Sequence, residues 1–210
     1  PFTSDNIAVN SVRAQYLEGI SKGEAACSYL DEEGVDSKNQ TETFVALKLE
    51  INNWRWSGVP FYLRTGKRMQ SKSSEIVVRY KTVPHNIFSK GAHLEPDQLV
   101  LRIHPDEGID LKLNTKRPGV SGYDLENLPL DLNLNEYHEI GHQDCYERLL
   151  LDVIKGNPSL FVRRDEIEAS WKWIDNIINL WKSEDVPMEE YISGGWGPSN
   201  ADLLIKRDFR

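Results

Sequence analysis

The stretch TFVALKLEI, residues 43–51, decides the fold class, because its large apolar side chains recur at every second position. Val45, Leu47, Leu49 and Ile51 would share one face of an extended chain, as they do in a strand with one buried face. The same period recurs in four later segments, at Ile76, Val78 and Tyr80; at Leu99, Leu101 and Ile103; at Ile109, Leu111 and Leu113; and at Leu128, Leu130, Leu132 and Leu134. No helical pattern separates these segments, so they predict a large, mostly antiparallel sheet.

Two amphipathic helices are predicted after the strands. Residues 144–155 place apolar side chains on one helical face, and Gly156 follows as a C-terminal stop. Residues 165–182 repeat apolar side chains at helical spacing and begin with acidic residues, which the helix dipole favours there. Strands followed by helices predict an α+β fold with the helices packed on one face of the sheet. The polar residues 1–40 are expected to form loops.

Composition and charge exclude several classes of function. The 210 residues are 39% hydrophobic and 28% charged, as in an ordinary folded protein, and we expect one domain over residues 1–210. The net charge of −8 argues against a nucleic-acid binder, because neutralising phosphates needs clustered Lys and Arg. It argues equally against binding to an anionic membrane surface. No apolar run reaches the roughly 18 residues that a membrane span needs.

The ends and the cysteines of the chain suggest its setting. No secretory signal opens the sequence, and Cys27 and Cys145 lie far apart, as expected for reduced thiols of a cytoplasmic protein. The first residue is Pro rather than Met, so the chain is expected to be part of a longer protein.

A short string, His138-Glu-Ile-Gly-His142, matches a zinc-protease pattern. In that pattern two histidines on one helical face bind zinc, and Glu139 acts as general base. The residues before the string look extended, Gly141 disfavours a helix, and no third ligand follows at the spacing of the longer motif. Cys145 lies where an ordinary helix is expected to begin. We therefore expect no metal site, and a zinc peptidase remains the alternative enzyme class.

A glycine-rich string, Gly194-Gly-Trp-Gly-Pro198, is a second candidate for a ligand site. It lacks the glycine spacing of a dinucleotide-binding loop, and no strand pattern leads into it. We expect it to form a tight loop before a terminal helix.

The most informative segment carries a concentration of positive charge. A short apolar strand, Val59–Leu63, is expected to run into a loop around Gly66. That segment holds four cations within nine residues: Arg64, Lys67, Arg68 and Lys72. Glycine lets a ligand approach the backbone closely, and such cations suit an anion such as a phosphate ester. From composition alone the segment is either a phosphate site or a solvated basic loop.

Four strings together resemble one known family. They are NNWRWSGVPFYLRTGKRM at 52–69, LVLRIHPDEGID at 99–110, DCYERLLLDVIKGNPSLFVRRDEIEASWKWID at 144–175 and GGWGPSNAD at 194–202. The first resembles the signature region of bacterial glucose-6-phosphate dehydrogenases, and the others follow in that family's order. The resemblance covers nearly everything from Arg13 to Asp202.

The resemblance implies that the functions of the complete protein are shared between this chain and an N-terminal domain outside it. In the family an N-terminal Rossmann domain binds NADP and brings the catalytic His, so no catalytic residue and no cofactor-binding residue is expected here. This chain is similar to the C-terminal α+β domain, which completes the glucose 6-phosphate pocket. The family's substrate-binding basic positions fall on Lys67 and Lys72. Animal members bind a structural NADP through basic residues, whose positions here are Ser73, Val77 and Trp196, so no such site is expected.

The resemblance also implies an assembly. Family members dimerise through the large sheet, so a homodimer or homotetramer is expected, with the polar sheet face against its twin. Sequence pattern alone slightly favours simple solvation of that face, and the resemblance favours the dimer. The resemblance implies oxidation of glucose 6-phosphate to its lactone by the complete protein and no hydride transfer by this chain alone. The alternatives are the zinc peptidase and a pure dimerisation module.

Overall fold

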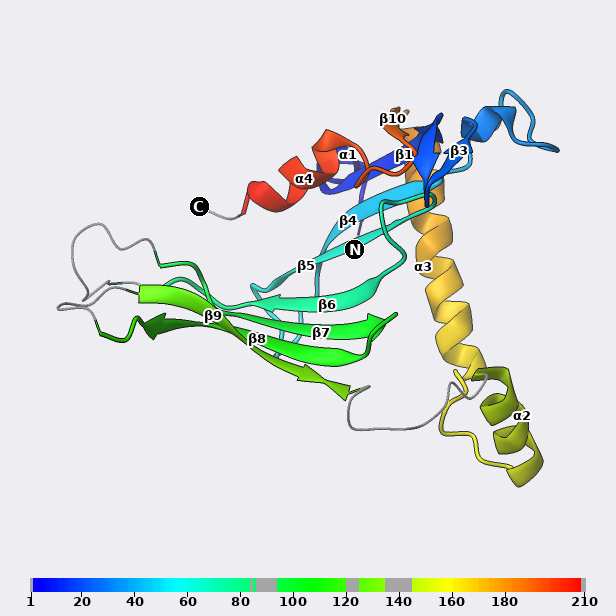
Figure 1. The fold of residues 1–210 in the computed structure, drawn as a ribbon. Helices are drawn as coiled ribbons and strands as arrows, with labels where there is room; N and C mark the ends of the chain where they lie inside the picture. Colours follow the sequence, from blue (N-terminus) through cyan, green and yellow to red (C-terminus); the bar gives the residue numbers. More distant parts are fainter. Residues whose placement is uncertain (1, 84, 86–93, 120–124, 135–144, 209–210) are drawn as a thin grey trace. The chain divides into compact units, whose positions relative to one another are not determined.

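The computed structural model divides the chain into two compact units, which are described separately (Figure 1). Unit 1 comprises Pro1–Ser71 and Pro158–Arg210, and unit 2 comprises Lys72–Asn157. The structure describes all residues except 1, 84, 86–93, 120–124, 135–144 and 209–210.

Unit 1 is built on a four-stranded sheet in the order β10-β1-β4-β5. Its strands are β1 (Ser11–Leu17), β4 (Phe44–Glu50), β5 (Pro60–Gly66) and β10 (Met188–Ile192). β1 pairs antiparallel with β4 and parallel with β10, and β4 pairs antiparallel with β5. The smaller elements of the unit are α1 (Ile7–Asn10), β2 (Gly19–Ser21), β3 (Glu24–Ala26) and η1 (Tyr29–Asp31).

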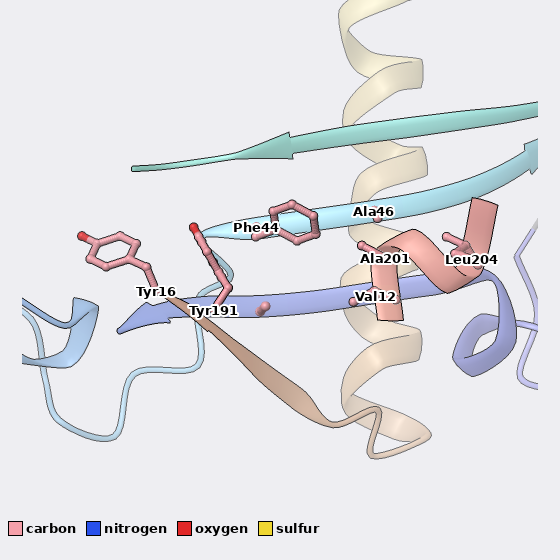
Figure 2. Packing of buried hydrophobic residues seen from close by; sticks show 8 residues of the cluster. Val12, Tyr16, Phe44, Ala46, Tyr191, Ala201 and Leu204 are labelled. Atoms are coloured by element: carbon pink, nitrogen blue, oxygen red, sulfur yellow. The ribbon is translucent and has the colours of Figure 1, made fainter. Parts of the chain in front are cut away.

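Two helices bury opposite faces of this sheet. α3 (Arg164–Ser183) contributes Ile177 and Trp181 to a cluster with Leu47 of β4. α4 (Ser199–Lys206) contributes Ala201 and Leu204 to a second cluster, which takes in residues of β1 and β4 (Figure 2). Since neighbouring side chains of a strand point to opposite faces, the two clusters lie on either side of the sheet.

The expectation of loops over residues 1–40 is wrong, because β1 is a central strand of unit 1. Its apolar side chains alternate with Ser11, Arg13 and Gln15, and these polar side chains are buried as well. The guanidinium of Arg13 lies 5.5 Å from the ring centre of Trp181 and 3.3 Å from a carboxylate oxygen of Glu42. The polar set therefore pairs within the interior instead of facing water.

Unit 2 contains a fully antiparallel sheet in the order β6-β7-β8-β9. Its elements are β6 (Ser74–Arg79), β7 (Gln98–His104), β8 (Gly108–Lys116), β9 (Leu125–Asn133) and α2 (Cys145–Lys155). The pairing register brings ten of the alternating apolar positions to one side, here called the apolar face: Ile76, Val78, Leu99, Leu101, Ile109, Leu111, Leu113, Leu128, Leu130 and Leu132. The opposite side, the polar face, carries Val77, Arg79, Gln98, Val100, Arg102, Asp110, Lys112, Pro129 and Asp131.

The α+β class is confirmed, and the five alternating segments and both long helices form where the sequence predicts them. Two details differ from the expectation. The described strands make two four-stranded sheets and the small β2-β3 sheet in place of one large sheet. Helices bury both faces of the four-stranded sheet of unit 1. Among the helices that the structure describes, none has the length and apolarity needed to cross a membrane.

Candidate functional site

The basic segment forms a sharp turn at the end of β5, here called the signature turn and defined as residues 66–70. β5 continues to Gly66, so Arg64 lies within the strand and not in the loop that was expected after Leu63. A β-carbon on Gly66 would lie 2.7 Å from the sulfur of Met69 and 2.8 Å from the ring of Phe44. Packing therefore excludes a side chain at the start of the turn.

Backbone hydrogen bonds fix the signature turn to unit 1. The N–H of Lys67 donates to the carbonyl of Thr43 at 2.8 Å, and the hydroxyl of Tyr191 donates to the carbonyl of Lys67 at 2.8 Å. The N–H of Gly194 donates to the carbonyl of Arg68 at 2.7 Å, and the N–H of Gln70 donates to Gly195 at 2.9 Å. The turn is therefore held by β4 and by the chain that follows β10.

The glycine-rich string serves this attachment and does not form an anion cradle. β10 ends at Ile192, shortly before Gly194, so the expectation that no strand leads into the string is wrong. The predicted terminal helix after it is confirmed as α4. Gly194 has a φ of 87°, and a β-carbon there would lie 1.9 Å from the carbonyl oxygen of Ile20. The N–H groups of Gly194 and Gly195 are used within the protein, by Arg68 and Ile192, which leaves neither for a pyrophosphate.

Arg64 is neutralised by a neighbour far along the chain. Its Nη1 lies 3.4 Å from Oδ1 of Asp202, at the start of α4. Its guanidinium also lies 5.5 Å from the ring centre of Trp196, a cation–π contact. This arginine therefore fastens β5 to the C-terminal segment.

Arg68 is neutralised by a second carboxylate. Its Nη2 lies 2.5 Å from Oε1 of Glu32, and its guanidinium lies 5.3 Å from the ring centre of Tyr16. The hydroxyl of Tyr16 donates to the same carboxylate at 2.9 Å. The hydrogen bond from Arg68 lowers the pKa of Glu32, with a further contribution from Tyr16, so the carboxylate stays ionised. Arg68 is therefore committed to holding the turn.

The two lysines of the segment differ from the two arginines. Both Lys67 and Lys72 are exposed, and neither ammonium forms an ion pair with any residue that the structure describes. Lys67 lies in unit 1, and Lys72 opens unit 2 before β6. Of the four cations, these two have no carboxylate partner among the described residues, so they can bind an external anion. That both of them hold substrate stays a prediction.

The zinc hypothesis rests on residues outside the described part of the chain. His138, Glu139 and His142 all fall there, and only the helix that begins at Cys145 is described, as expected. Among the described residues, no group of three or more His, Cys, Asp or Glu side chains could hold a metal ion.

Three charged side chains on the polar face of unit 2 pair with one another. Arg102 lies 2.9 Å from a carboxylate oxygen of Asp110 and 2.8 Å from one of Asp131. A β-carbon on Gly108 would lie 2.2 Å from Nη2 of Arg102, so glycine makes room for the guanidinium. Burial raises the pKa of Asp110, whereas the hydrogen bond from Arg102 lowers that of Asp131. These contacts link neighbouring strands, since Arg102 lies in β7, Asp110 in β8 and Asp131 in β9.

Sequence reasoning missed the residues that hold the turn: Thr43, Tyr191 and Glu32. Tyr191 lies 124 positions from Lys67 and Glu32 lies 36 from Arg68, so no local spacing connects them. The sequence MEEYI at 188–192, which contains Tyr191, shows no period-two alternation that would predict a strand.

Comparison with known proteins gives one consistent result. The family model described as "Glucose-6-phosphate dehydrogenase, C-terminal domain" matches residues 1–210. Glucose-6-phosphate 1-dehydrogenase of Rhizobium meliloti (strain 1021) is 49% identical over 212 residues, covering 100% of this chain and 43% of that protein. The enzyme of the same name from Zymomonas mobilis is 46% identical over 212 residues, covering 99% of this chain and 43% of that protein.

Solved structures agree. A glucose-6-phosphate dehydrogenase in complex with its substrate glucose-6-phosphate matches with a TM-score of 0.83 and 32% identity, over 99% of this chain and 41% of that one. Glucose-6-phosphate 1-dehydrogenase from Mycobacterium avium matches with a TM-score of 0.73 and 34% identity, over 94% of this chain and 39% of that one. The chain thus spans less than half the length of the relatives that it matches.

Proposed function

This chain belongs to the family of glucose-6-phosphate dehydrogenase C-terminal domains, and from that membership we propose that it completes the sugar-phosphate site of such a dehydrogenase. The complete protein oxidises C1 of D-glucose 6-phosphate to 6-phosphoglucono-1,5-lactone and passes the hydride to NADP. Lys67 and Lys72 bind the substrate. The zinc peptidase is not favoured, because nothing in the described residues or the family assignment supports it.

The proposal rests on the surroundings of Lys67. Its backbone is hydrogen-bonded on both sides, to Thr43 and Tyr191, while its ammonium is exposed and has no carboxylate partner among the described residues. A cation held in place but not neutralised is what a phosphate or sugar hydroxyl needs for a charge-assisted hydrogen bond. Lys67 therefore positions substrate and moves no proton.

We propose that NADP binds outside this chain. The glycine-rich string is the nearest approach to a nucleotide loop, and its N–H groups at Gly194 and Gly195 bond to Arg68 and Ile192. When bound elsewhere in the complete protein, NADP supplies the hydride acceptor. The described residues contribute only substrate binding, so the chain alone should not reduce NADP.

Replacing Lys67 tests the proposal in the complete protein. Lys67→Ala should raise KM for glucose 6-phosphate about ten- to a hundredfold, since a hydrogen bond to a charged group is worth roughly 1.5–3 kcal/mol. Lys38→Ala, which removes another exposed lysine of unit 1, is the matched control and should leave KM unchanged. Steady-state kinetics with varied glucose 6-phosphate measure both. A normal KM in the Lys67 variant would remove this lysine from the site.

We further propose a homodimer that forms through the polar face of unit 2. That face carries both signs of charge, as a self-complementary interface across a two-fold axis requires. The interface should exceed roughly 1,000 Å² in total and should weaken with added salt. Sedimentation equilibrium of the chain at several salt concentrations measures this, and a monomer at all micromolar concentrations would overturn it.

A further inference from the structure

We infer that Tyr191 is a positioning residue for Lys67: its hydroxyl, through the Lys67 carbonyl, sets where the substrate-binding ammonium lies. The inference rests on the proposed role of Lys67 in binding glucose 6-phosphate. It adds a residue that makes no contact with substrate and lies 124 positions away in the sequence.

The geometry makes Tyr191 a fixed donor. Its side chain is 4% exposed, and its ring lies 5.5 Å from the ring of Phe44 and 6.3 Å from that of Tyr16, centre to centre. Its hydroxyl lies 2.8 Å from the carbonyl of Lys67, 3.1 Å from Oγ1 of Thr43 and 3.2 Å from the carbonyl of Thr43. A phenol has one hydrogen, and the shortest of these contacts is the one to Lys67. Figure 2 shows the Tyr191 ring between those of Tyr16 and Phe44.

Three further features bear on the hydrogen bond between Tyr191 and Lys67. The N–H of the same residue donates to Thr43, so Tyr191 and Thr43 together fix both peptide groups that flank its α-carbon. Burial raises the pKa of Tyr191, so the phenol remains a donor throughout the neutral range. The next residue, Arg68, has a φ of 46°, an uncommon conformation for a side chain with a β-carbon. The hydrogen bond from Tyr191 is one of the restraints that hold the chain in this conformation at Lys67 and Arg68.

The test is a double-mutant cycle in the complete protein. Tyr191→Phe keeps the ring and its packing and removes only the hydroxyl, with its contacts to Lys67 and Thr43. We expect KM for glucose 6-phosphate to rise roughly three- to tenfold, with kcat and the KM for NADP within about twofold of the wild type. In a Lys67→Ala background the same substitution should change KM no further, because the displaced ammonium is already gone. A merely structural role would give the same effect in both backgrounds.

Tyr29→Phe is the matched control. The Tyr29 ring packs against Tyr16 in the same cluster, 5.7 Å between centres, and no hydrogen bond of its hydroxyl is found among the described residues. This variant should leave KM unchanged. Thermal melting checks that all variants are folded. If a variant melts below the assay temperature, the kinetics of all variants are measured at a lower temperature, where we expect the same pattern of KM values.

The outcomes separate the inference from the function on which it rests. If Lys67→Ala leaves KM unchanged, the proposed role of Lys67 fails. If Lys67→Ala raises KM but Tyr191→Phe does not, or raises it equally in both backgrounds, the proposed function stands and the role of Tyr191 is overturned. A rise with Tyr191→Phe that vanishes in the Lys67→Ala background supports the inference.

Discussion

Unit 1 and unit 2 have sheets of the same size but differ in what is buried against them. Both core clusters of the described residues lie in unit 1, where Phe44 is 1% exposed and Ile177 is 1% exposed. In unit 2 the apolar face is much more open, with Leu130 62% exposed and Ile76 50% exposed. Alternation in sequence thus tells which side chains share a face. It does not tell what covers that face.

The largest expected effect comes from the core of unit 1. Phe44→Ala should lower the free energy of unfolding by about 3–5 kcal/mol, because it removes a fully buried ring from contact with Tyr191 and Gly197. Leu130→Ala on the apolar face of unit 2 should lower it by less than about 1 kcal/mol, since most of that side chain is exposed. Denaturant unfolding of the chain measures both. Equal losses would mean that another part of the protein covers the apolar face.

The next largest effect is the loss of stability on replacing Gly194 with alanine, compared with the same change at Gly119, which has a similar φ. Gly194 has a φ of 87° and Gly119 has a φ of 80°, so alanine is strained at either position, by about 1–2 kcal/mol. Only at Gly194 would the new β-carbon also meet a backbone atom, the carbonyl oxygen of Ile20, at 1.9 Å; nothing lies within 4 Å at Gly119. Gly194→Ala should therefore destabilise the chain by about 1–3 kcal/mol more than Gly119→Ala. Thermal melting of the two variants side by side provides the measurement, and similar melting points would mean that the loop has room to move.

The strands predicted from alternation all form. Alternation is a local signal: in each of these strands one face is apolar and the other is mostly polar. β1 has the same alternation, with Val12, Ala14 and Tyr16 on one side. The polar composition of residues 1–40 nevertheless favours a loop there. The interior accepts those polar groups through partners that are distant in sequence, such as Trp181, whose indole N–H donates to Ser11 at 2.9 Å. β10 pairs with β1 across more than 170 positions, and no local pattern reveals that pairing.

The candidate site shows the same contrast between features that local sequence predicts and contacts that come from distant residues. The basic segment and its two lysines were predicted from sequence, and the structure finds both lysines exposed. That Arg64 and Arg68 are neutralised depends on Asp202 and Glu32, 138 and 36 positions away. Composition counts four equivalent cations. The family resemblance selects Lys67 and Lys72, and the tertiary contacts add the physical reason: both arginines are paired with carboxylates.

The smallest expected effect concerns one carboxylate in each unit. In unit 1 the carboxylate of Asp208 accepts hydrogen bonds from Lys48, at 2.7 Å, and from the hydroxyl of Tyr62. These contacts lower the pKa of Asp208 below its ordinary 3.8, the bond from Lys48 contributing most. In unit 2 burial instead raises the pKa of Asp110, which shares Arg102 with Asp131.

The two substitutions should therefore differ in their dependence on pH. A lowered pKa in the folded state contributes stability that is complete above the ordinary value of 3.8 and is lost as the pH falls through the folded value. Asp208→Asn should thus destabilise the chain by about 0.5–1 kcal/mol at neutral pH, the modest amount typical of a partly exposed pair. That difference should disappear in acid. Asp110→Asn should show no such loss at neutral pH, because the folded state already disfavours the charged form of that carboxyl. Urea unfolding of both variants is measured from neutral pH to below the lowered, folded-state pKa of Asp208. A loss in the Asp208 variant that persists there would show that packing, and not charge, causes it.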